Sequence, residues 1–437
     1  MRPAGLLGSK RAVAGIAALL SAGGMALAVT VSAPADRDDG RGHGKSDHRG
    51  RGPSAENIIF LHGDGLSNSA REAIRLATVG TFDDLTMNKL PVAGLAHTEP
   101  DDPDEIVTDS AAGAVAFASG VKTYNGAIGV DAEGNRVPTV LERAGDAGKS
   151  TGLVTTAQVT DASPAAFAAH VPDRSQQTEI ARQYLEDSRV DVILGGGEDY
   201  WYPTGNPGAY PDNPPKDPTE QSRSNQGNLV ERAQRLGYQY VSTEAQLQRA
   251  RSSKLLGLFA NQEMFEQRAE GEGDIYDPVV SLPDMARKAL DILSRDRDGF
   301  FLVVEEEAID EFEHRNNATR TIQAGQQLDE AVEVALAFAA RNPRTLIIVA
   351  ADHETGGLAI ENATDTTVPT GGGAGAEDGP FDVVGTDLQF TIDWTTTNHT
   401  GAPTPVTAYG PGSEALDGVI QNTDIHDAMV DAMRLRR

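Results

Sequence analysis

Residues 107–114 have the sequence VTDSAAGA, in which a serine follows an acid and precedes a run of small helix-forming residues. This pattern predicts that Ser110 lies at or beside the start of a helix. The unpaired backbone N–H groups and the positive end of the helix dipole at that position favour an alkoxide and a bound anion. Ser110 is therefore a candidate nucleophile, provided that another group removes its proton.

The sequence places no general base beside Ser110, but it does contain acids and histidines spaced like metal ligands. Asp64, Glu305 and the pair Asp352-His353 each end or follow an apolar, strand-like run. Their side chains offer oxygen and nitrogen ligands suited to Zn²⁺ or Mg²⁺. A serine activated by metal ions is the hypothesis that follows from this pattern.

Asp310 and His314 form a more local pattern. Four residues separate them, so in a helical turn both lie on one face and can share an ion. The alternative is a solvated acidic start to a helix, because four glutamates crowd the same region. These are Glu306, Glu307, Glu311 and Glu313. The local pattern alone leaves both interpretations open.

Such residues need a scaffold that brings the ends of strands together. Strand-like and helix-like runs alternate from residue 57 onward. We expect strands at 57–61, 151–155, 190–194, 300–304 and 345–350, and helices at 110–119, 139–148, 281–295 and 320–341. This alternation predicts an α/β fold of three layers, α/β/α, around a central, mostly parallel sheet. Functional residues in open sheets of this kind cluster at the carboxyl ends of the strands.

The composition restricts the classes of partner. The chain has 437 residues, enough for one large domain or two, and a formal net charge of -28. Such acidity argues against a nucleic-acid partner, and an anionic substrate would need local positive charge, of which bound dications are the simplest source. The absence of cysteine excludes disulfides, thiolate ligands and a cysteine nucleophile.

The N-terminal region predicts export. Residues 1–35 contain a basic start, an apolar stretch and small-residue cleavage sites, which is typical of a signal peptide; a transmembrane anchor is the alternative. Residues 36–53 are polar and read as a disordered linker, so that residues 54–437 form a single catalytic domain. We therefore expect a secreted or periplasmic protein without a stable membrane anchor after cleavage. Two loop-like stretches, 201–228 and 364–379, are surface insertions or lids.

A series of short motifs runs in order from about residue 57 to residue 433. They are GDG at 63–65, TDSAA at 108–112, GVKTYN at 120–125, DASPAA at 161–166, the stretch from His170 to Arg174, VE at 304–305, ID at 309–310 with His314, ADHE at 351–354, HTG at 399–401 and AYGP at 408–411. In this order the motifs resemble the alkaline phosphatase family. Each motif is weak alone, and their order across nearly the whole mature chain carries the resemblance.

The resemblance implies a role for each matching residue. Ser110 would be the phosphorylated nucleophile, Arg174 would clamp two phosphate oxygens, and Asp109 would orient Arg174. One Zn²⁺ would be held by Asp310, His314 and His399. A second Zn²⁺, which also contacts Ser110, would be held by Asp64, Asp352 and His353. One Mg²⁺ would be held by Asp64, Ser163 and Glu305, with Asp161 and Glu311 just outside the ligands.

The implied activity is the hydrolysis of phosphate monoesters to an alcohol and inorganic phosphate through a phosphoserine, in a homodimer. A phosphodiesterase or sulfatase of the same superfamily remains an alternative, as does a non-catalytic binder of phosphate or metal. The chain departs from the family where Glu306 and Glu307 replace small residues and where Glu311 replaces Lys or His. Ser163 stands where Thr is common, and its hydroxyl can serve equally as a ligand.

Overall fold

The computed structural model describes residues 54–212, 220–363 and 378–436, which belong to one compact unit, Arg51–Arg437. The expected signal peptide (1–35) and linker (36–53) lie outside the described residues, as do residues 364–377 of the second loop-like stretch. Between residues 201 and 228 the described part of the chain contains no helix or strand. No helix in the described ranges has the length and apolarity needed to cross a membrane.

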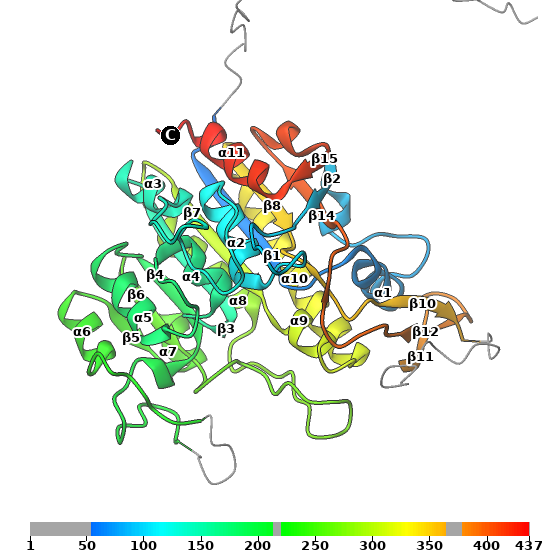
Figure 1. The fold of residues 1–437 in the computed structure, drawn as a ribbon, viewed down its shortest axis with the longest axis horizontal. Helices are drawn as coiled ribbons and strands as arrows, with labels where there is room; N and C mark the ends of the chain where they lie inside the picture. The colour runs from blue at the N-terminus through cyan, green and yellow to red at the C-terminus, as the bar shows by residue number, and fades with distance from the viewer. Residues whose placement is uncertain (1–53, 213–219, 364–377, 437) are drawn as a thin grey trace, which may run out of the picture. The chain divides into compact units, whose positions relative to one another are not determined.

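A ten-stranded sheet forms the middle layer of the described residues (Figure 1). Its order is β15-β2-β14-β8-β1-β7-β3-β4-β6-β5. The strands are β1 (Asn57–Gly63), β2 (Val92–His97), β3 (Ser150–Gln158), β4 (Val192–Gly196), β5 (Gln239–Val241), β6 (Leu255–Leu258), β7 (Phe300–Glu306), β8 (Thr345–Ala350), β14 (Thr404–Tyr409) and β15 (Gly418–Gln421). Only β14 runs antiparallel to its neighbours in this sheet, which confirms the mostly parallel α/β fold.

Helices cover both faces of the sheet. One face carries α1 (Asn68–Thr78), α8 (Leu282–Leu293), α9 (Ala308–Glu313) and α10 (Ala318–Ala339). The other carries α2 (Ser110–Ser119), α3 (Val140–Asp146), α4 (Ala162–Ala168), α5 (Gln177–Glu186) and α11 (Asn422–Met433). Alternate residues of β1 enter the two cores: Ile59 and Leu61 one, Ile58 and Phe60 the other. A strand buried on both faces has a continuous apolar run, as residues 58–61 of β1 do.

Smaller elements lie at the margins. Helices α6 (Leu229–Arg235) and α7 (Glu244–Arg249) flank β5, and short 3₁₀ turns occupy Met87–Lys89, Glu198–Tyr200 and Ser413–Leu416. A three-stranded sheet contains β10 (Ala359–Asn362), β12 (Gln389–Asp393) and β11 (Asp378–Asp382). A two-stranded pair joins β9 (Glu354–Thr355) to β13 (His399–Thr400).

The element boundaries differ from the sequence-based expectation mainly at β3 and β4. β3 continues to Gln158, and β4 continues through Gly195 and Gly196. The glycines stay in the sheet because their backbone still pairs, Gly195 with Leu258 and Gly196 with Gln158. Glycine weakens a strand but does not end it when neighbouring backbone approaches closely.

The parallel register aligns the ends of the central strands. His62 of β1 pairs with Glu305 of β7 and with Ala350 of β8. Thr155 of β3 pairs with Glu305 as well. Residues that follow these strands therefore meet at one edge of the sheet, the carboxyl edge.

Helix α2 packs against this edge. Asp109 caps its start by accepting a hydrogen bond from Ala112 N at 2.9 Å, and the helix ends at Gly120, whose φ of 73° suits a glycine. All of its residues are buried. Gly113 allows α2 to lie against Asp352, because a Cβ at this position would come within 2.8 Å of the Asp352 Cβ.

The Gly113→Ala substitution should therefore destabilise the protein. The added methyl group must push α2 away from Asp352, at a cost of roughly 1–3 kcal/mol in the free energy of unfolding. The matched control is Gly145→Ala in α3, where the nearest atom to an added Cβ is Thr151 Cγ2 at 3.9 Å. Denaturant unfolding of both variants checks the prediction, and equal stabilities would contradict it.

Candidate active site

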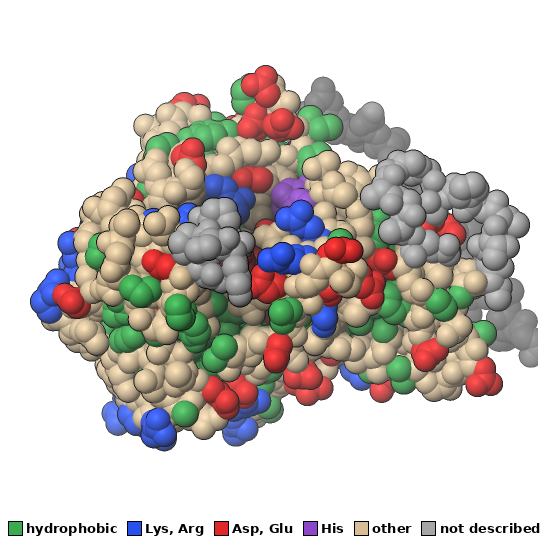
Figure 2. Space-filling model, turned by 90° about the horizontal axis from the view of Figure 1, so that it is seen from below, with side chains coloured by type: hydrophobic (Ala, Val, Ile, Leu, Met, Phe, Trp, Pro, Cys, Tyr) green, Lys and Arg blue, Asp and Glu red, His purple; other side chains and the backbone are tan. Residues whose placement is uncertain are grey.

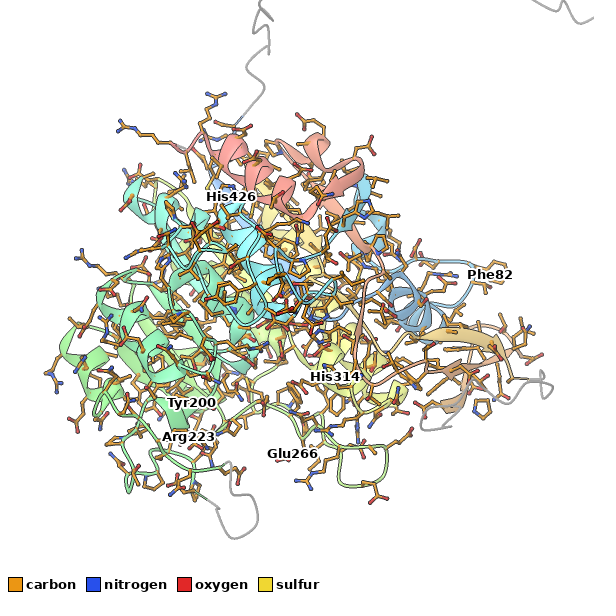
Figure 3. All side chains as sticks on the ribbon, viewed as in Figure 1. Phe82, Tyr200, Arg223, Glu266, His314 and His426 are labelled. Atoms are coloured by element: carbon orange, nitrogen blue, oxygen red, sulfur yellow. The ribbon has the colours of Figure 1, made fainter. Side chains whose placement is uncertain are left out.

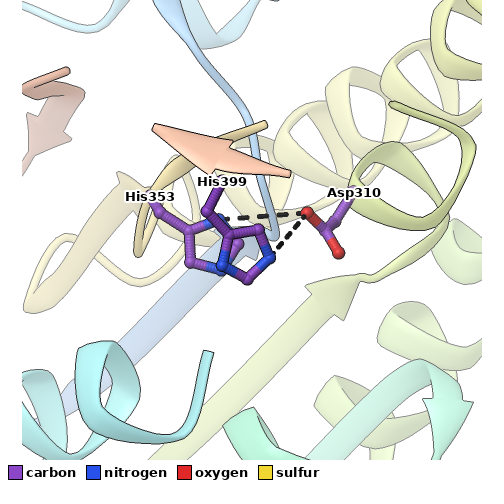
Figure 4. Close-up of side chains that lie close together, drawn as sticks. All are labelled: Asp310, His353 and His399. Carbon is purple, nitrogen blue, oxygen red and sulfur yellow. Dashed lines mark ion pairs between the residues drawn. The ribbon is translucent and has the colours of Figure 1, made fainter. Parts of the chain in front are cut away.

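The first cluster at the carboxyl edge joins Asp310, His314 and His399. Asp310 lies in α9 and His314 directly follows that helix, while β13 delivers His399. His314 Nε2 lies 3.2 Å from Asp310 Oδ2 and 3.0 Å from His399 Nε2. His399 Nε2 lies 3.6 Å from Asp310 Oδ1, as Figure 4 shows. The three side chains therefore converge, as the resemblance implies.

The second cluster joins His353, Asp352 and Asp64. His353 Nε2 lies 3.2 Å from Asp352 Oδ2 and 3.6 Å from Asp64 Oδ1. The other nitrogen of the same ring, Nδ1, faces the first cluster, 3.9 Å from Asp310 Oδ1. His353 also stacks on His399 with ring centroids 3.5 Å apart. The His353 ring thus stands between the two clusters.

The third cluster consists of oxygen donors. Ser163 Oγ donates to Asp64 Oδ2 at 3.3 Å. Asp64, Glu305 and Glu307 each place one carboxylate oxygen within 4.8 Å of the others. Asp64 therefore belongs to both the second and the third cluster, which is the bridging position that the resemblance implies.

Buried carboxylate oxygens that accept no hydrogen bond indicate that these clusters suit cations. Asp64 and Asp352 are fully buried, and Asp64 Oδ1 and Asp352 Oδ2 accept no hydrogen bond from the described residues. A buried carboxylate without compensation is costly, and a bound dication compensates it. Mixed nitrogen and oxygen donors suit Zn²⁺, whereas the third cluster, with oxygen alone, suits Mg²⁺.

The candidate nucleophile lies beside the second cluster. Ser110 begins α2, and only 4% of its surface is exposed. Its Oγ lies 3.3 Å from His353 Nε2. That nitrogen also faces Asp352 and Asp64, so it is not available as a general base for the serine. Ser110 therefore lies within reach of the side chains of the second cluster.

Arg174 is held by two acids next to this serine. Its Nη1 donates to Asp109 Oδ2 at 3.3 Å, and its Nη2 donates to Asp161 Oδ1 at 2.9 Å. Asp109 directly precedes Ser110, so the same residue caps the helix and orients the guanidinium. Asp161, which caps α4, lies beside Ser163.

Three residues that the sequence motifs did not assign to the site support the ligand side chains. His62 is buried and lies between two carboxylates, with Nδ1 3.1 Å from Glu305 Oε1 and Nε2 3.2 Å from Asp352 Oδ1. Thr155 Oγ1 donates to Glu305 Oε2 at 2.6 Å, and Thr355 Oγ1 donates to Asp310 Oδ1. The pairing of β1, β3 and β7 places His62 and Thr155, so sequence spacing alone does not reveal them.

The backbone conformation at residue 65 explains why a glycine follows Asp64. Its φ of 70° lies in the left-handed region, and its backbone N–H donates to Asp352 Oδ1 at 3.3 Å. A side chain here would also meet the Asp310 backbone, since a Cβ would lie 2.9 Å from its Cα. The turn therefore needs glycine to bring Asp64, Asp352 and Asp310 together.

The glutamates around Asp310 do not form a solvated helix start. Glu306, Glu307 and Glu313 are buried, while Glu311 is partly exposed. Burial raises the pKa of Glu306 to about 8 and that of Glu311 to about 8. The alternative interpretation of this region is therefore wrong, because the acids face the interior of the fold and the clusters.

One face of the described part of the chain is hollowed. Figure 2 shows a hollow with a histidine side chain inside it and with both acidic and basic side chains around it. In Figure 3, His314 lies toward the same lower side of the molecule as Tyr200, Arg223 and Glu266. The Arg223 guanidinium lies over the Tyr200 ring, 5.2 Å from its centroid.

A mostly parallel sheet with carboxylates and histidines clustered at its carboxyl edge is typical of an α/β enzyme whose site lies at the strand ends, and these side chains form groups that could hold metal ions. The sequence profile of the alkaline phosphatase family matches residues 55–384. The chain belongs to the alkaline phosphatase family, whose members are metal-dependent phosphoric monoester hydrolases.

Individual relatives agree with this assignment. Alkaline phosphatase of Escherichia coli is 35% identical over 87% of this chain and 87% of its own length. Streptomycin-6-phosphate phosphatase of Streptomyces griseus is 33% identical over 94% of this chain and 96% of its own. The structure of alkaline phosphatase from the Antarctic bacterium TAB5 is similar with a TM-score of 0.70 and 29% identity, over 88% of this chain and 100% of that one.

Metal binding at the first cluster should depend on pH. Burial lowers the pKa of His314, but its hydrogen bond to Asp310 and the charge of that carboxylate raise it from 6.5 to about 9. The ion pair stabilises the metal-free fold fully below the unfolded pKa, and this stabilisation is lost as pH rises through about 9. Protonated histidine cannot bind a metal, so the affinity should rise over the same range.

Near neutral pH, Zn²⁺ uptake should therefore release about one proton from His314. Calorimetric titrations in buffers of different ionisation enthalpy measure this release, which should fall toward zero above the pKa of His314. The control is His314→Asn. An unchanged proton release in this variant would assign the proton to another group.

Proposed function

We propose that this chain hydrolyses phosphate monoesters through a covalent phosphoserine on Ser110, assisted by two zinc ions and one magnesium ion. The observation that carries the proposal is the position of the buried Ser110 Oγ, 3.3 Å from His353 Nε2 in the metal-ligand clusters. Membership of the family supports the reaction class.

Ser110 and Arg174 have separate roles toward the substrate, as nucleophile and as phosphate-binding group. Arg174 binds two phosphate oxygens through its planar guanidinium, which Asp109 and Asp161 hold in place. Ser110 loses its hydroxyl proton to solvent, and its oxygen attacks phosphorus as the bond to the leaving alkoxide breaks. The alkoxide takes up a proton from solvent and leaves as the alcohol. Water then attacks the phosphoserine, which releases inorganic phosphate and restores the Ser110 hydroxyl.

The three clusters support a proposed set of ligands for each ion. We propose Asp310, His314 and His399 for one zinc, Asp64, Asp352 and His353 for the other, and Asp64, Ser163 and Glu305 for magnesium. When bound, the ions supply the positive charge that lowers the pKa of the serine hydroxyl and of water and stabilises the leaving oxygen. A mutant of the related TAB5 enzyme has been solved with magnesium bound, which supports a magnesium site.

The Ser110→Ala variant tests the proposal. Wild-type protein incubated with phosphate at low pH, where phosphoserine hydrolysis is slow, should carry one phosphoryl group on Ser110 by peptide mass spectrometry. The variant should lose this group and at least about 10³-fold in kcat, while its content of bound metal stays near that of the wild type. Full turnover by the variant, or by chelated wild-type protein, would reject the mechanism.

The same assay separates the alternatives in reaction class. Comparison of kcat/KM for nitrophenyl phosphate, bis-nitrophenyl phosphate and nitrophenyl sulfate should favour the monoester. Arg174 and Ser110 suit a terminal phosphate with free oxygens, since a diester has one fewer to offer the guanidinium. A preference for the diester or sulfate would reassign the activity.

Glu311 should weaken the binding of inorganic phosphate. It is partly exposed, and one of its oxygens lies within 4.8 Å of carboxylate oxygens of Asp310 and Glu307. The comparison is made above the Glu311 pKa of about 8, where its carboxylate is charged. There Glu311→Lys removes a negative charge and adds a positive one near the phosphate site, so competitive inhibition by phosphate should tighten by about threefold to tenfold. Glu244→Lys on the exposed surface of α7 makes the same charge change as a control. An unchanged inhibition constant in Glu311→Lys would contradict the prediction.

We also propose the cellular context that the sequence predicts. Residues 1–35 would direct export and be removed, residues 36–53 would serve as a linker, and residues 54–437 would act as one catalytic domain, outside the cytoplasm and as a homodimer. The basic and apolar pattern of the N-terminal residues supports export.

A further inference from the structure

Glu307 is a buried acid for which the family motif provides no role. It stands two residues after Glu305, at the turn between β7 and α9, and only 4% of its surface is exposed. Its backbone N–H donates to Thr156 Oγ1 at 3.0 Å, which fixes the turn. Within the described residues, its carboxylate has no hydrogen bond and no ion pair.

The adjacent Glu306 is a buried acid in the same turn whose two carboxylate oxygens both accept hydrogen bonds. Its Oε1 accepts from Thr156 Oγ1 at 2.7 Å, and its Oε2 accepts from Tyr276 Oη at 2.7 Å. Both oxygens of the Glu306 carboxylate therefore accept hydrogen bonds from other side chains of the protein. Of the two additional glutamates, only Glu307 keeps a carboxylate that is free for a ligand.

The Glu307 carboxylate points into the third cluster. One of its oxygens lies within 4.8 Å of an oxygen of Asp64 and of an oxygen of Glu305. Asp64 Oδ1 is buried and also accepts no hydrogen bond from the described residues. Among the described residues, Glu307 thus places a buried carboxylate without a hydrogen bond in the volume that it shares with Asp64 and Glu305, and Ser163 borders this volume through its hydrogen bond to Asp64 Oδ2.

We propose that Glu307 is a direct ligand of the cation held by Asp64, Ser163 and Glu305, an inference that rests on the proposed three-metal site. The donor set then contains three carboxylates and one hydroxyl, all oxygen. Hard cations such as Mg²⁺ and Mn²⁺ take such donors, and a larger number of charged ligands tightens binding. The third ion of this chain is accordingly held more tightly than three ligands alone would hold it.

Glu307→Gln tests this role with metal binding as the readout. Protein loaded with two equivalents of Zn²⁺ is titrated with Mg²⁺ by calorimetry and with Mn²⁺ by electron paramagnetic resonance. The substitution should weaken both affinities by about tenfold or more. The rise in Tm on adding Mg²⁺ should shrink, while the Tm of the metal-free variant equals or exceeds that of the wild type, because the unfavourable burial of the Glu307 carboxyl beside other acids has been removed.

The matched control is Glu311→Gln. It removes the same charge from a residue close to Glu307 and Asp310 that is not part of the group with Asp64 and Glu305. Its loss of Mg²⁺ affinity should stay below about threefold. Equal losses in the two variants would mean that Glu307 acts only through its field, and would overturn the proposal.

Two further outcomes separate this proposal from the proposed function. If zinc-loaded wild-type protein takes up no further dication, the three-metal function fails together with the role of Glu307. If the wild type takes up one ion and Glu307→Gln binds it equally well, only the role of Glu307 fails. A metal-free variant that melts well below the wild type would show that Glu307 supports the fold through protein contacts, which also contradicts ligation.

Discussion

The site depends on one electrostatic constraint, the concentration of buried carboxylates at the carboxyl edge of the sheet. Asp64, Glu305 and Asp352 are fully buried, and Asp310 is nearly so. Mutual repulsion would oppose the fold unless positive charge stood among them, and His62 and Arg174 supply only part of it. The arrangement therefore makes cation binding and the folded state of this edge parts of the same equilibrium.

The surrounding structure keeps these acids in place without consuming all of their oxygens. Hydroxyl groups of Thr155 and Thr355 and the ring of His62 each hold one oxygen of a ligand carboxylate. Such supporting contacts orient a ligand carboxylate, and Glu305 is held at both oxygens, with Oε1 beside His62 Nδ1 and Oε2 bonded to Thr155 Oγ1. Gly65 and Gly113 contribute because they lack a side chain. This allows a close approach to the Asp310 backbone at Gly65 and to Asp352 at Gly113. The positions of the ligand side chains therefore depend on the residues around them as much as on the ligand residues themselves.

The sequence predicted the fold class, and it predicted that acids meet at one edge of the sheet, because both features leave local signals. Apolar runs gave the strands, and acids at their ends gave Asp64, Glu305 and Asp352. The burial of Glu306 and Glu307 left no such signal, since a run of glutamates reads as solvated until Tyr276 and Thr156 are brought beside it by distant segments. The support by His62 likewise depends on the register between β1 and β7. Long-range pairing, which spacing does not encode, accounts for these gaps.

The pairing of β13 with β9 has a consequence for assembly. His399 reaches the site because it pairs with Thr355, so one ligand comes from near the end of the chain while Asp64 comes from near its beginning. The first cluster is therefore incomplete in a growing chain until His399 is present, whereas the residues of the other two clusters are all present by His353. Formation of the first cluster thus follows that of the other two in chain order.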